Sequence, residues 1–162
     1  MRVTIAGIKR SGSTAQYNMA RLILQKYYYL TVYGQEYELT KGCSLIKHHP
    51  FDKELFSASD YVLTTDRPDE EIIESLDKFG SHNRYGLDMM RKHLQEWRSH
   101  NKNLHQEYSE ILNNPKQCIK EIADFLELYE VDVNEIYKEF KQIKPTKEYD
   151  PITMLFPNHI SK

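Results

Sequence analysis

The sequence has few cysteines, no long apolar run and no excess of basic residues. Its two cysteines, Cys43 and Cys118, are too few and too far apart for a disulfide framework or a zinc site, so we expect a reducing, cytoplasmic environment. No segment approaches the about 18 apolar residues of a membrane span, and the N-terminal apolar run has the length of a strand, not of a signal peptide. The 22 basic residues against 24 acidic ones argue against a general nucleic-acid-binding protein.

The patterning that is present predicts an α/β domain. A chain of 162 residues is long enough to bury a substantial core, and we expect residues 1–162 to form a single domain. Short β-branched or apolar runs predict strands at 3–6, 29–33, 44–47 and 60–65. Helical spacing predicts helices at 14–26 and from residues 68, 84, 115 and 132 onward. The expected fold is three-layered and P-loop-like, with a central parallel sheet and a helix-rich second half.

The loop between the first expected strand and the first expected helix is the most informative segment. Gly7 and Gly12 are separated by four residues, as in the first part of a Walker A loop, Gly-x4-Gly-Lys-[Ser/Thr]. A Ser-Thr pair follows Gly12 directly, so the usual lysine is missing, and Lys9 and Arg10 lie inside the loop instead. Small residues allow backbone N–H groups to face an anion, and the helix N-terminus adds partial positive charge. The loop therefore predicts a phosphate site.

The second strand end, Lys47-His48-His49, is expected to lie at the same edge of the sheet as this loop. Ligands of open parallel sheets bind at the carboxyl ends of the strands. A neighbouring cation such as Lys47 favours the neutral imidazole that a general base needs near pH 7. Consecutive residues of a strand point to opposite faces, so only one of the two histidines should enter the site.

The third strand end, Asp66-Arg67, leaves two interpretations open. Asp66 is either a magnesium ligand of the Walker B kind or a helix cap before Pro68. Arg67 ends a strand and Ser75 lies two turns into the next helix, so both side chains could reach one phosphate. The tail from residue 144 to 162 is expected to be either a structured loop over the site or a frayed end.

These segments, in this order, resemble the sulfotransferases that use 3′-phosphoadenosine 5′-phosphosulfate (PAPS). Residues 9–14 look like that family's 5′-phosphosulfate loop, with Arg10 at its basic position. Residues 46–50 look like its Lys-Thr-His segment, which places His49 on the catalytic base and His48 on the threonine. Residues 62–75 resemble its 3′-phosphate motif, and residues 108–126 resemble a stretch whose tyrosine, here Tyr108, can lie near the adenine.

The resemblance also has departures. The Arg-Lys-Gly segment with which many members close on the 3′-phosphate is absent, and the chain is shorter than many members. Segments 149–153 and 158–161 look like the C-terminal part of some small bacterial-type members.

The resemblance implies sulfuryl transfer from PAPS to a hydroxyl or amine of a small-molecule or glycan acceptor, with no metal required. His49 would be the general base, and Arg10 and Lys47 would assist catalysis. The donor would be bound by Lys9, Arg10, Ser11, Gly12, Ser13, Thr14, Arg67, Ser75 and Tyr108. Two alternatives remain open: a magnesium-dependent P-loop kinase with Asp66 as the metal ligand, and a nucleotide-binding module without catalysis.

Overall fold

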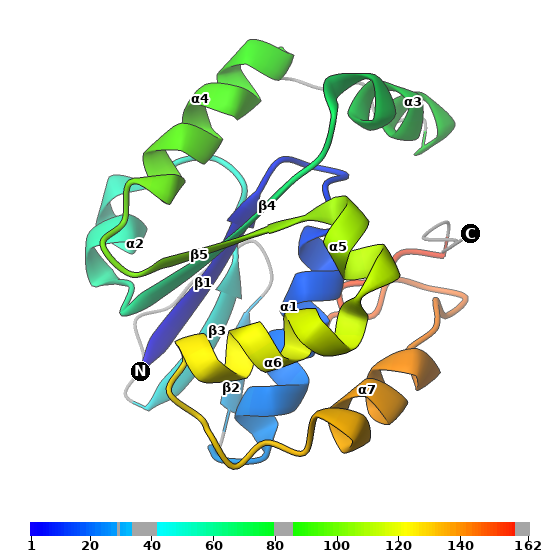
Figure 1. Cartoon of the computed structure of the whole chain (residues 1–162). Helices are drawn as coiled ribbons and strands as arrows, with labels where there is room; N and C mark the ends of the chain where they lie inside the picture. The colour runs from blue at the N-terminus through cyan, green and yellow to red at the C-terminus, as the bar shows by residue number, and fades with distance from the viewer. Residues whose placement is uncertain (29, 34–41, 80–85, 158–162) are drawn as a thin grey trace.

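A computed structural model describes residues 1–28, 30–33, 42–79 and 86–157, and its centre is a parallel sheet (Figure 1). The five strands are ordered β2-β3-β1-β4-β5, and every neighbouring pair is parallel. Their bounds are β1 (Arg2–Gly7), β2 (Leu30–Tyr33), β3 (Cys43–Lys47), β4 (Tyr61–Asp66) and β5 (Asn103–Glu107).

The central strands form where the sequence is apolar or β-branched over four to six residues. β3 is buried at every position, and β1 and β4 at all but one end, as expected for strands with helices on both faces. The sequence predicts these three strands, and it also predicts a strand at the position of β2. It does not predict β5, whose sequence Asn-Leu-His-Gln-Glu is mostly polar and which lies at the sheet edge with only Gln106 buried.

Helices cover both faces of the sheet and form the two outer layers of the expected three-layer fold. They are α1 (Ser13–Gln25), α2 (Lys53–Ala58), α3 (Asp69–Phe79), α4 (Leu87–Arg98), α5 (Tyr108–Asn113), α6 (Pro115–Phe125) and α7 (Val133–Gln142). α1, α5, α6 and α7 lie on one side, and α2, α3 and α4 lie on the other (Figure 1). The largest apolar cluster joins α1, α6 and α7 to the sheet. The three-layer α/β fold with a helix-rich second half is thus confirmed.

The helix ends differ from the sequence prediction in detail. The sequence does not predict the six-residue helices α2 and α5, because so short a segment spans fewer than two turns and its apolar spacing hardly repeats. Pro68 precedes α3, and its carbonyl accepts the N–H of Ile72 at 3.0 Å. Asn114 stands at the N-cap of α6 without a side-chain cap bond. Asp132 does cap α7, accepting the N–H groups of residues 134 and 135.

The described part of the tail is a structured loop against α1. Tyr17 Oη donates to the Ile152 carbonyl at 3.1 Å, and Asn18 Nδ2 donates to the Thr153 carbonyl at 2.8 Å. An antiparallel bridge between Asp150 and Leu155 closes the loop. Tyr29, Arg84 and residues 158–161, which also enter the sequence predictions, lie outside the described residues.

Two further observations concern the state of the cysteines and the length of the apolar helices. Cys43 and Cys118 are free and buried, as expected for a chain without disulfides. In the parts of the chain that the structure describes, no helix combines the length and the apolar character needed to cross a bilayer.

The packing of Trp97 predicts a large cost for its removal. Its ring is fully buried against Phe51 and Phe56, and its Nε1 donates to the Pro50 carbonyl at 3.2 Å. We expect Trp97→Ala to lower the free energy of unfolding by about 3–5 kcal/mol in a urea titration. Trp97→Phe, which keeps an aromatic ring, should cost clearly less. A loss below about 1 kcal/mol for the alanine variant would contradict this packing.

Candidate functional site

The loop between β1 and α1 is held in a left-handed turn. Arg10 has φ 72° and Gly12 has φ 91°, and α1 begins directly after Gly12. The left-handed region costs a non-glycine residue about 1–2 kcal/mol, so Arg10 is strained unless its surroundings hold it. The first N–H groups of any α-helix lack intrahelical partners. Together with the turn, they give this loop the form of an anion-binding site.

Ser11 secures the loop. Its hydroxyl is fully buried, lies 2.7 Å from Thr65 Oγ1 and donates to the Ile8 carbonyl at 2.6 Å. A Cβ at Gly7 would collide with the same threonine hydroxyl, so only glycine permits this approach of β1 and β4. In this structure the Ser11 side chain locks the loop to β4; contact of its hydroxyl with the donor stays a prediction.

Lys47 brings a buried cation to the start of α1. Its Nζ donates to Thr14 Oγ1 at 2.6 Å, and the side chain is 9% exposed. Burial is the largest cause that lowers the pKa of Lys47 to about 8, and the nearby cations Arg10 and Lys9 contribute to the same shift. A cation held at such a cost, beside a loop that favours anions, points to a ligand that supplies the missing negative charge.

His49 is oriented for proton acceptance. Its Nδ1 lies 2.6 Å from the carbonyl oxygen of Gly7, which only accepts, so Nδ1 carries the hydrogen and Nε2 has a lone pair. Burial and the neighbouring Lys47 lower the pKa of His49 to about 3. The imidazole is therefore neutral at pH 7. His49 also lines a small cavity of about 20 Å³ with Gly7, Lys9, Pro50, Met90 and His93.

His48 and His49 are thus distinguished by their contacts. The imidazole of His49 bonds to the Gly7 carbonyl at the end of β1, and the backbone N–H of His48 continues the ladder by donating to the Ile5 carbonyl at 2.9 Å. The alternation expected for a strand end therefore sends His49 toward the loop.

The third strand end reaches the same loop. Arg10 Nε donates to Ser75 Oγ at 2.9 Å, and Arg67 Nη1 approaches the Arg10 carbonyl at 3.4 Å. Burial lowers the pKa of Arg10, and the Arg67 guanidinium adds to this effect. Arg10 thus contacts both Ser75 and Arg67, two residues that are distant from it in the sequence. That Arg67 and Ser75 bind one phosphate stays a prediction.

Arg67 is also held by two residues. Its Nε donates to Glu71 Oε2 at 2.7 Å, and its Cζ lies 4.1 Å from the centre of the Tyr108 ring. The sequence resemblance places Tyr108 near an adenine, but in the structure one face of this ring is covered by Arg67. Glu71 is not among the predicted site residues, although its four-residue spacing from Arg67 is typical of ion pairs.

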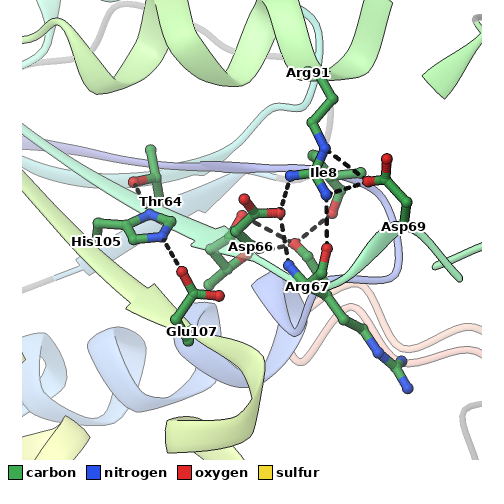
Figure 2. Close-up of polar contacts among 10 residues, drawn as sticks. Ile8, Thr64, Asp66, Arg67, Asp69, Arg91, His105 and Glu107 are labelled. Atoms are coloured by element: carbon green, nitrogen blue, oxygen red, sulfur yellow. Dashed lines mark hydrogen bonds and ion pairs between the residues drawn. The ribbon is translucent and has the colours of Figure 1, made fainter. Parts of the chain in front are cut away.

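Asp66 has partners that bear on its proposed metal role. Its Oδ1 accepts from the Arg67 N–H at 2.6 Å and forms a short ion pair with Arg91, which also pairs with Asp69 (Figure 2). Arg91 thus compensates the charge that would attract magnesium. The neighbouring strand β5 brings His105 and Glu107 near Asp66, and the three offer ligand atoms within 4.8 Å of one another. The sequence predicts neither β5 residue, because it does not predict β5.

The structure has the fold of known sulfotransferases. A retinol dehydratase in complex with androsterone and the inactive cofactor PAP matches with a TM-score of 0.66 and 12% identity, over 97% of this chain and 71% of the other. A complex of retinol dehydratase with retinol and PAP matches with a TM-score of 0.64 and 12% identity, over 94% of this chain and 67% of the other. The mouse sulfotransferase SULT7A1 complexed with PAP matches with a TM-score of 0.62 and 13% identity, over 86% of this chain and 63% of the other.

The class that the fold defines is therefore an α/β protein of sulfotransferase-like fold, with a cluster of basic side chains at the carboxyl edge of its sheet. At 12–13% identity the likeness is one of fold. Comparison of the sequence with protein-family models found no match, and comparison with curated proteins found none.

The buried cation predicts an unusual stability profile. Between pH 8 and about 10.5 the unfolded state binds more protons at Lys47 than the folded state, so stability should rise with pH over this window. Lys47→Met removes the buried charge, so at pH 7 the variant should be more stable than the wild type, by an amount that shrinks toward pH 10. Thermal unfolding of both proteins from pH 7 to 10 measures this. A pH-independent difference would contradict it.

Proposed function

We propose that this protein transfers a sulfuryl group from PAPS to a hydroxyl or amine acceptor. The observation that carries the proposal is the neutral, Nδ1-protonated His49 bonded to the backbone of a basic phosphate loop. Neighbours of the same fold contain PAP, the nucleotide that such a transfer leaves behind. The combination of a neutral imidazole with a lone pair on Nε2 and a basic loop fits in-line transfer between an acceptor and a phosphosulfate.

In the proposed reaction, the acceptor oxygen or nitrogen bonds to sulfur while the bond between sulfur and the 5′-phosphate oxygen breaks. The acceptor proton passes to Nε2 of His49. Negative charge grows on the leaving phosphate, where Arg10, the protonated Lys47 and the N-terminal amides of α1 stabilise it. Catalysis would rest on positioning and electrostatics, as in phosphoryl transfer.

The proposed donor-binding set follows the sequence prediction except for Ser11 and Tyr108. Lys9, Gly12, Ser13 and Thr14 would surround the 5′-phosphosulfate, and the buried Ser11 would shape the loop without contact. Arg67 and Ser75 would bind the 3′-phosphate. The retinol and androsterone of the structural neighbours are small-molecule ligands, and we propose a small-molecule acceptor for this protein as well. A cytoplasmic location stays a prediction.

A magnesium-dependent kinase is the second candidate. It is favoured by the approach of Asp66, His105 and Glu107 to one another, and weakened by the ion pair between Asp66 and Arg91 and by the absent lysine after Gly12. Strict dependence of turnover on magnesium would favour this alternative. A binding module without catalysis would bind nucleotide but transfer nothing to any acceptor.

Nucleotide preference is the first test. We expect 3′,5′-diphosphoadenosine to bind at least about tenfold more tightly than ADP, because one charged hydrogen bond contributes about 1.5–3 kcal/mol. Arg67→Ala should abolish most of this preference, whereas Arg98→Ala, on the exposed end of α4, should not. Isothermal titration calorimetry measures each affinity. Equal binding of the two nucleotides by the wild type would refute the PAPS assignment.

The base is tested by its pH profile. We expect His49→Ala to lower turnover about 10²–10⁴-fold, and His48→Ala to have a much smaller effect. A base is active above its pKa, so a pKa of about 3 leaves wild-type kcat/KM free of a histidine limb between pH 5 and 8. A decline with a midpoint near the ordinary histidine value of about 6.5 would contradict the assigned state of His49.

A further inference from the structure

Tyr108, the first residue of α5, lies between two parts of the nucleotide site. The guanidinium of Arg67 lies over its ring, with Cζ 4.1 Å from the ring centre. The edge of the same ring faces the phosphate loop: a Cβ placed at Gly12 would come within 2.7 Å of Tyr108 Cδ2. One half-buried ring therefore contacts both the loop and the arginine of the third strand end.

Arg67 is restrained on two sides. The Tyr108 ring covers one face of its guanidinium plane, and Glu71 accepts from Nε at 2.7 Å. Glu71 is on the first turns of α3, four residues after Arg67, and its side chain is 49% exposed. A guanidinium has five N–H donors in a fixed fork. One face and the Nε edge are engaged, and Nη1 makes a long contact of 3.4 Å to the Arg10 carbonyl. The Nη edge is therefore the part of the guanidinium that a phosphate could bind.

Resting on the proposed function, we propose that Tyr108 and Glu71 are positioning residues for the 3′-phosphate. They hold the Arg67 guanidinium with its Nη1 beside the carbonyl of Arg10, whose own side chain donates to Ser75. Tyr108 also joins this subsite to the 5′-phosphate loop through Gly12. This role adds to the place near the adenine that the sequence resemblance implies for Tyr108.

The physical basis is preorganisation. An unrestrained arginine loses side-chain freedom when it binds a phosphate, and a ring and a carboxylate that already fix its orientation reduce that loss. The attraction between a guanidinium and a ring uses the π face, which phenylalanine also offers. The carboxylate of Glu71 acts at Nε, on a different edge from the Nη groups, so the phosphate and Glu71 can share one arginine.

Tyr108 is tested by the ratio of the affinities for 3′,5′-diphosphoadenosine and ADP. We expect Tyr108→Leu to reduce this ratio about five- to thirtyfold, because the cation–π contact is lost. Tyr108→Phe should keep the ratio within about twofold of the wild type. A merely structural role would weaken both nucleotides equally and leave the ratio unchanged. Calorimetry gives both affinities, and thermal unfolding shows that each variant is folded.

Glu71 is tested in the same assay. We expect Glu71→Ala to lower the ratio several-fold and Glu71→Gln, which keeps an oxygen acceptor for Nε, to lie between that variant and the wild type. Glu74→Gln is the matched control, because its carboxylate pairs with Lys78 on the same helix. A higher ratio in Glu71→Ala would overturn the proposal, since it would mean that the carboxylate repels the phosphate more than it orients Arg67.

Different experimental results would refute the positioning roles and the proposed function. A wild type that does not distinguish the two nucleotides refutes the proposed PAPS function itself. A wild type that prefers the 3′-phosphorylated nucleotide, with Tyr108→Leu and Glu71→Ala retaining that preference, leaves the function standing and refutes the positioning roles.

Discussion

The close approach of β1 to β4 at Gly7 is the constraint on which the site depends. Because Gly7 has no side chain, Thr65 can lie directly against it. The Thr65 hydroxyl forms a hydrogen bond with the buried Ser11 hydroxyl, and this bond fixes the loop. The carbonyl of Gly7 fixes the tautomer of His49. Arg67 follows Thr65 by two residues, so the same approach sets its distance from the loop. One glycine thus determines how the base, the loop and the third strand end lie relative to one another.

The electrostatics of the site oppose those of the whole chain. The protein carries a formal net charge of −2, yet Lys9, Arg10, Lys47 and Arg67 gather around one loop. Burial lowers the pKa of Lys47 and Arg10, which means that their charged forms are disfavoured in the free protein. Such an arrangement lowers the stability of the folded protein and favours the binding of an anion. This conflict is common at functional sites. Burial and the neighbouring cations Lys47 and Lys9 also keep His49 neutral.

The contacts of Asp66 and Arg67 bear on the choice between the proposed sulfuryl transfer and magnesium-dependent phosphoryl transfer. Asp66 is paired with Arg91, and Arg67 is oriented by Tyr108 and Glu71 near the phosphate loop. At this strand end a positive side chain therefore faces the loop, and the carboxylate of Asp66 is engaged by Arg91. A fixed cation in this place fits the proposed binding of a second phosphate better than the binding of a metal.

The sequence by itself determined the parallel α/β core, the position of the loop after β1 and the position of His49 just beyond β3. Each depends on neighbours a few residues away: apolar runs, a four-residue glycine spacing and a strand end. Tertiary structure alone decided the rest. Ser11 belongs to a pattern of phosphate loops, but its hydroxyl turns inward because Thr65, 54 residues away, bonds to it. β5 is too polar to be recognised locally and forms because β4 offers it a free edge. Tyr108 meets Arg67 and Gly12 only after that strand is in place, since contacts between distant residues follow from the packing of whole elements.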